Sequence, residues 1–165
     1  MAVTYTATER KHAILAMLPG AKRIGNGQRW VIQLSDGKRA MLKTSLNDNI
    51  MVKTDVSNPE NAVISGFSDD VDHVLAVTGA IGSLSAYQVP IGTVEDEFRT
   101  QQRKWMDEDP ENRSNTTWSL SGLGKRFEAY RYDIDLQAIT PDEAKRRLAV
   151  HFQTTPDKIN ISVSV

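Results

Sequence analysis

Residues 30–44 read WVIQLSDGKRAMLKT and have the pattern of a β-hairpin. Apolar side chains recur at every second position of the first half: Trp30, Ile32 and Leu34. Such alternation is typical of a strand with one buried face. The pair Asp36-Gly37 favours a tight turn into the second strand. We expect residues 50–54 to add a third strand, which gives an antiparallel meander.

A helix is expected before the hairpin, and a second pair of strands after it. Thr6 and Glu9 have the spacing of a capping box, and Pro19 ends the helical run that they begin. Residues 71–77 and 84–91 are rich in apolar side chains, and small residues connect them. We therefore expect a short amphipathic helix followed by the meander and a further strand pair.

A helix, a loop and a strand are expected next. Thr93, with an acidic residue three positions later, is the expected N-cap of a helix that ends close to Pro110. Residues 112–121 are polar and loop-like, with Trp118 as an apolar anchor. Residues 127–134 mix aromatic and charged side chains and are assigned to a strand.

The C-terminal part carries the clearest helix signal of the chain. Thr140 is the expected N-cap, Pro141 the first helical residue, and Glu143 completes a capping box. Residues 159–165 then alternate apolar and polar side chains, as a half-buried strand does. The expected fold class is α+β in a single domain, residues 1–165: an N-terminal helix, an antiparallel meander, packed helices and a C-terminal helix–strand unit.

Composition narrows the classes of protein. The chain has 165 residues, of which 39% are hydrophobic and 25% charged, as in one globular domain. It has no cysteine, which excludes disulfides, thiolate zinc sites and cysteine nucleophiles. Its net charge of −1 means that any contact with nucleic acid must come from a local basic patch. We find no pattern of a signal peptide or membrane span, and expect a cytoplasmic protein without membrane contact.

Two carboxylates form the candidate metal site. Asp70 and Asp72 fall on one face of an expected strand and could ligate a divalent metal, with Lys43 or Lys53 nearby. Metal-dependent nucleases add an acidic-x-Lys triplet on a neighbouring strand, whereas the triplets of this chain fall on helices or in the hairpin turn. The histidine and serine spacings match no hydrolase motif either. We therefore expect no enzyme and no cofactor, and keep a degenerate nuclease-like hydrolase as an alternative.

Cationic and aromatic side chains interleave in residues 125–132, which is the best binding signal. The candidate binding residues are Trp118, Lys125, Arg126, Tyr130, Arg131, Tyr132, Arg146 and Arg147. On a strand, the segment would serve first in core packing, then in a protein interface, and last in contact with nucleic acid. A second basic group, residues 145–147, could be joined by Lys22, Arg23 and Arg29 if the fold brings them together.

Three functions remain open at this point. The first is a non-enzymatic binding module for a protein partner or for a second copy of the chain, because no complete catalytic constellation is present. The second is a module that binds nucleic acid through Lys125, Arg126, Tyr130, Arg131 and the basic turn at residues 146–147. The third is the metal-dependent hydrolase. Exposure of the aromatic residues would support the first, and their burial would argue against it.

Overall fold

The chain divides into two compact units, Met1–Ile134 and Asp135–Val165. This computed structural model describes residues 5–25, 29–54, 64–65, 71–81, 83–114 and 117–134 of the first unit. In the second it describes residues 145, 148–149, 152 and 154–160. The single domain that we expected over residues 1–165 stays a prediction.

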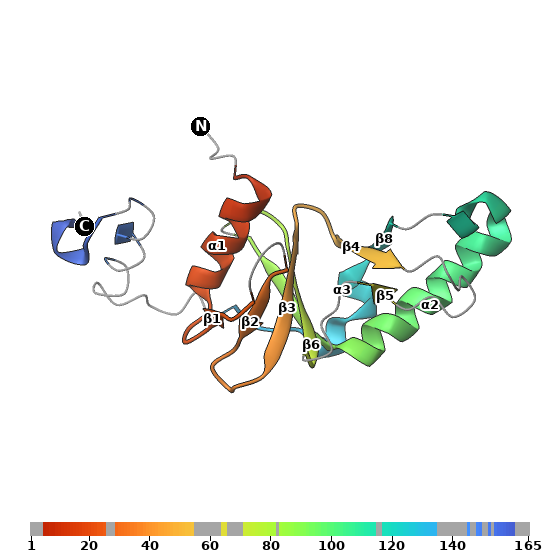
Figure 1. Cartoon of the computed structure of the whole chain (residues 1–165), viewed down its shortest axis with the longest axis horizontal. Helices are drawn as coiled ribbons and strands as arrows, with labels where there is room; N and C mark the ends of the chain where they lie inside the picture. Colours follow the sequence, from red (N-terminus) through yellow and green to blue (C-terminus); the bar gives the residue numbers. More distant parts are fainter. Residues whose placement is uncertain are drawn as a thin grey trace. The chain divides into compact units, whose positions relative to one another are not determined.

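The first unit combines helices with two β-sheets, which confirms the α+β class (Figure 1). Its elements in chain order are α1 (Ala7–Met17), β1 (Lys22–Arg23), β2 (Val31–Gln33), β3 (Arg39–Ser45), β4 (Asn49–Thr54), β5 (Ile64–Ser65), β6 (His73–Thr78), β7 (Ser85–Pro90), α2 (Ile91–Glu108), η2 (Pro110–Ser114), β8 (Thr117–Ser121), α3 (Leu123–Arg126) and η3 (Glu128–Tyr130).

The larger sheet has the strand order β1-β2-β3-β6-β7. The expected hairpin is confirmed as the antiparallel β2–β3 pair, whose turn is closed by a 3.0 Å hydrogen bond from the Lys38 N–H to Asp36 Oδ1. The expected second strand pair is confirmed as antiparallel β6–β7. The sequence did not predict that β3 and β6 pair in parallel, with Leu42 beside Leu75. This pairing puts the carboxyl ends of both strands at one edge of the sheet.

The expected three-stranded meander is wrong, because β4 leaves the hairpin for a second sheet of order β5-β4-β8. There Ile50 pairs with Leu120 and Val52 with Trp118, and all four side chains are buried. Residues 112–121, expected as a loop, therefore end in strand β8. Strands β4 and β8 each alternate buried and more exposed side chains, and each buries one face when the two strands pair. The polar residues before β8 made this alternation hard to recognise in the sequence.

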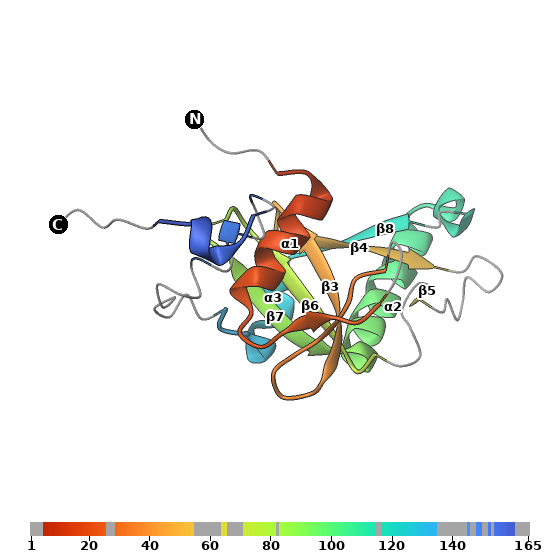
Figure 2. The same ribbon diagram turned by 60° about the vertical axis from the view of Figure 1, so that its left-hand side comes forward.

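Helices cover both faces of the larger sheet (Figures 1 and 2). Helix α1 packs Ile14 and Leu18 against the core that contains Leu42 and Leu75, and its expected capping box between Thr6 and Glu9 is confirmed. Helix α2 contributes Phe98 to the second core. Because α1 and α2 pack on opposite faces of the larger sheet, strands β3 and β6 lie at the centre of the unit.

Helix α2 begins two residues before the N-cap that the sequence predicted. Pro90 is its N-cap, and the N–H of Ile91 donates to the Asp72 carbonyl at 3.1 Å. Thr93 as N-cap is therefore wrong, because a tertiary hydrogen bond and the fixed φ of proline start the helix directly at the end of β7. The expected end next to Pro110 is confirmed.

Residues 127–134 do not form the expected strand. Leu123–Arg126 form α3 and Glu128–Tyr130 form η3, and Arg131 makes only an isolated bridge to Tyr87. The physical reason is the spacing of Leu123 and Phe127, which are four residues apart and both fully buried. That spacing matches one turn of helix, so both side chains reach the core only if the backbone coils.

The second unit is described in part. Lys145, Leu148 and Ala149 are helical, and the Phe152 N–H donates to the Leu148 carbonyl at 2.9 Å. The expected capping box at Thr140 lies outside the described residues, as do residues 161–165 of the expected strand. The described end of the unit holds η4 (Pro156–Lys158). Among the described residues, no helix is both long and apolar enough to span a membrane.

Candidate functional site

Trp30, the residue just before β2, is surrounded by side chains that carry or can carry positive charge. Its ring is only 5% exposed. The guanidinium carbon of Arg23 lies 4.2 Å from the ring centroid, and the ammonium of Lys11 lies 5.7 Å from it. The ring of His12 meets Trp30 edge to face, with 4.7 Å between centroids. Cations over an indole face are attracted by its quadrupole, so Trp30 holds these groups together.

Local folding explains why these groups converge on Trp30. The Trp30 carbonyl accepts a 2.8 Å hydrogen bond from the Leu42 N–H, which extends the β2–β3 ladder by one residue. Arg23 pairs with Ile32 in the adjoining β1–β2 register. Lys11 follows the buried Arg10 on α1 and flanks the face of that helix that packs on the sheet, whereas His12 is exposed. Three elements, α1, β1 and β2, thus build one surface.

Arg10 ties α1 to the carboxyl ends of the parallel strands. Its Nη2 donates to the Ser45 carbonyl at 2.9 Å and also to the Gly79 carbonyl. Burial lowers the pKa of Arg10 below its ordinary value. The carbonyls at the strand ends would otherwise lack partners, so this contact fixes the position of α1, and with it Lys11 and His12, on the sheet.

Neighbouring cations affect the pKa values of two lysines. Burial lowers the pKa of Lys11, and the charge of Arg23 lowers it further. The pKa of Lys43, on β3, is lowered first by burial and then by the charges of Lys11 and Lys53. Lys43 lies beside Ala76 in the β3–β6 register, on the face of the sheet opposite to Leu42 and Trp30, so it does not share their surface. We name Arg23 and Lys11, the two cations on the Trp30 ring, the cation row. Lys22 and Arg29, next to it in sequence, are exposed.

Trp118, a candidate binding residue, is part of the core. It is 6% exposed, and its ring stacks on that of Trp105, with 4.7 Å between centroids and 4° between planes. The sequence placed it as an anchor in a loop. The pairing of β8 with β4 instead turns it inward, against α2.

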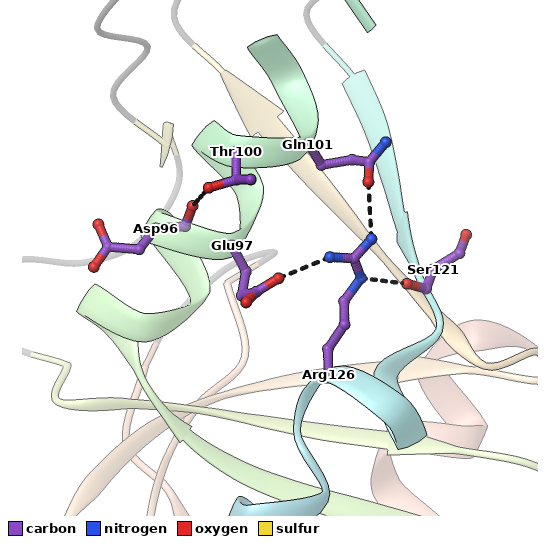
Figure 3. Close-up of polar contacts among 6 residues, drawn as sticks. All are labelled: Asp96, Glu97, Thr100, Gln101, Ser121 and Arg126. Atoms are coloured by element: carbon purple, nitrogen blue, oxygen red, sulfur yellow. Dashed lines mark hydrogen bonds and ion pairs between the residues drawn. The ribbon is translucent and has the colours of Figure 1, made fainter. Parts of the chain in front are cut away.

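Arg126, the second candidate, is held within the fold by all three guanidinium nitrogens (Figure 3). Its Nε donates to the Ser121 carbonyl at 2.8 Å, its Nη1 to Glu97 at 2.7 Å and its Nη2 to Gln101 at 2.8 Å. Glu97 and Gln101 belong to α2, so Arg126 joins that helix to β8 and α3. The positive charge of Arg126 is therefore paired with Glu97 within the protein.

The remaining residues of the 125–132 segment point to different surroundings. Lys125 is exposed, and Arg131 is exposed and ion-paired with Glu128 at 3.3 Å. Tyr130 packs against the core under α2, whereas Tyr132 packs against the core under α1. Burial raises the pKa of Tyr132, and the charge of Asp36 adds to the effect. Because the segment is helical, the two faces that strand alternation predicted do not exist.

The candidate metal residues and the second basic group are described only in part. Asp72 is exposed, with its N–H bound to the Arg39 carbonyl at 3.1 Å. Asp70, Arg146 and Arg147 lie outside the described residues. Where the chain is described, no three histidine or acidic side chains are grouped closely enough to hold a metal ion.

Sequence reasoning singled out Arg23 as part of a basic group but missed its neighbours on the surface around Trp30. Lys11 and His12 lie on α1, 11 or more positions before Arg23. Only the packing of α1 on the sheet brings them together. No family model matches the sequence, and no curated protein or solved structure is similar to it.

Proposed function

We propose that this chain is a non-enzymatic module that binds nucleic acid through its phosphate backbone, with the cation row as the contact surface. The observation that carries the proposal is the convergence of Arg23 and Lys11 on Trp30, at 4.2 Å and 5.7 Å from the ring centroid. Two cations over one buried ring concentrate positive charge on a surface of a chain whose net charge is only −1.

Energetics favour an anionic partner for this surface. Burial and the charge of Arg23 both disfavour the protonated form of Lys11, and a bound anion offsets that effect. A phosphate oxygen placed between these two cations removes that repulsion and forms charge-assisted hydrogen bonds. A linear polymer of phosphates satisfies both cations at once and releases its counterions.

A nucleic acid explains the surface better than a protein partner does. Protein interfaces depend on exposed aromatic anchors, and Trp118, one of the candidate binding residues, is buried. Trp30 is buried too, so the cation row offers charge without a large apolar anchor. We therefore rank nucleic acid before a protein partner or a homo-oligomer, and make those two outcomes of the test.

The test is a fluorescence-anisotropy titration with single-stranded and duplex oligonucleotides at low salt. Lys11→Met should weaken binding about three- to tenfold, the effect of losing one phosphate contact, and Lys43→Met, on the opposite face of the sheet, should not. Lys104→Met is the matched control, because Lys104 is an exposed lysine paired with Glu108 on α2. Equal affinity of all three variants, or equal binding of poly-glutamate, would contradict the proposal and favour a protein partner.

A further inference from the structure

His12 is an exposed ring beside the cation row. It lies on α1, one residue after Lys11, and its ring plane makes an angle of 74° with that of Trp30. Lys11 and Arg23 contact the same indole, so these two cations and the exposed ring of His12 all pack against the buried side chain of Trp30. Neither the charge of the row nor the packing of the core requires an exposed ring at this position.

The Trp30 side chain, against which His12 packs, is held rigidly. The Trp30 ring is buried, and its backbone continues the β2–β3 ladder through the hydrogen bond from Leu42. An edge-to-face contact with such a ring restricts the rotamers of His12. The imidazole is therefore ordered before any ligand arrives, which reduces the entropy lost on binding.

We propose that His12 stacks on one base of a single-stranded nucleic acid whose phosphates lie along the cation row. This inference rests on the proposed function and adds the class of nucleic acid. Proteins that bind single strands place aromatic rings, histidine among them, next to cations that hold the backbone. The bases of a duplex already stack on one another. The same arrangement therefore favours the binding of single strands over the binding of duplexes.

Two substitutions separate stacking from packing and from charge. His12→Phe keeps a flat ring, and His12→Leu keeps an apolar side chain of similar size without one. Neither carries a charge, and both preserve apolar contact with Trp30, so both are expected to fold. Circular dichroism and thermal unfolding check that they do.

The experiment measures the affinity of wild type and both variants for three probes at one low salt concentration: a single-stranded oligonucleotide, an abasic strand of equal length and charge, and a duplex. We expect wild type to prefer the base-bearing strand over the abasic one by about tenfold. His12→Phe should keep that preference, and His12→Leu should lose it. Affinity for the abasic strand should differ little among the three proteins.

Equal affinity of wild type for the base-bearing and abasic strands would overturn the stacking inference and leave the proposed function intact. Equal behaviour of His12→Leu and His12→Phe would overturn it as well. Failure of all three probes to bind wild type would overturn the proposed function, and the inference with it. The abasic strand thus distinguishes the failure of one proposal from the failure of both.

Discussion

The guanidinium of Arg23 lies over the ring of Trp30, 4.2 Å from its centroid, and belongs to a strand of only two residues at the edge of the larger sheet. A strand this short has few backbone hydrogen bonds of its own. The contact with Trp30 therefore holds β1 in place as well as positioning a positive charge. The Arg23–Trp30 contact therefore contributes both to the stability of β1 and to the proposed binding surface.

Replacement of Arg23 separates these two roles. Arg23→Lys keeps the charge and loses the planar stack on the indole, and we expect a loss of stability below about 1 kcal/mol with nearly unchanged affinity for oligonucleotides. Arg23→Met should lose both. Urea denaturation and anisotropy check this, and an affinity of Arg23→Lys as low as that of Arg23→Met would show that charge alone does not explain binding.

The lowered pKa of Lys43 predicts how stability changes with pH. The folded-state pKa lies below the ordinary value of 10.5, so the folded protein releases this proton first as pH rises. Below the folded-state pKa both states are protonated, and the fold bears the full cost of the buried charge. Between the folded pKa and 10.5 the unfolded chain holds more protons, and stability rises.

Comparison with Lys43→Met isolates this contribution. We expect the difference in unfolding free energy between the variant and wild type to shift in favour of wild type as pH is raised from about 7 to about 10. Urea denaturation at the two pH values measures it. A difference that is independent of pH would mean that Lys43 is not strained by burial and by its neighbours.

Gly79 is expected to tolerate no side chain. Its φ is +92°, and a Cβ placed on it would lie 2.3 Å from the Ser83 carbonyl oxygen. Gly37, with a φ of +84° and no atom within 4 Å of such a Cβ, is the matched control. We expect Gly37→Ala to cost about 1 kcal/mol from backbone strain alone, and Gly79→Ala to cost at least about 3 kcal/mol. Similar costs in urea denaturation would contradict the clash.

Arg126 and Arg131 should behave differently although both were candidate binding residues. Arg126→Met leaves Glu97, Gln101 and the Ser121 carbonyl without their donor, and should cost about 2 kcal/mol of stability with little change in affinity for oligonucleotides. Arg131→Met removes only an exposed ion pair and should cost less than about 1 kcal/mol. A large loss of affinity in Arg126→Met with unchanged stability would restore it as a binding residue.

Local sequence signals predicted the elements whose determinants are local. The capping box of α1, the Asp36-Gly37 turn and the apolar runs of β6 and β7 depend on neighbouring residues, and all are present in the structure. The departure of β4 into a second sheet and the parallel β3–β6 pair depend on which strands meet in space. Alternation within a strand contains no information on that choice.

The error at residues 127–134 was avoidable in part. Leu123, Phe127 and Tyr130 follow a spacing of four and three, which is helical, and the aromatic residues alone suggested alternation. The surface around Trp30 was not predictable in the same way. Lys11 and His12 are ordinary polar residues of a helix, and only the packing of α1 on the sheet brings them to Trp30.

The salt dependence of oligonucleotide binding tests the central claim most directly. If a single strand contacts the two residues of the cation row, the logarithm of affinity should fall with the logarithm of salt concentration with a slope of about −1.4, at roughly −0.7 for each contact. Lys11→Met should make that slope shallower by about 0.7, and Lys104→Met should leave it unchanged. An affinity that does not fall as salt rises, or a slope that Lys11→Met leaves unchanged, would contradict a phosphate-binding role for the cation row.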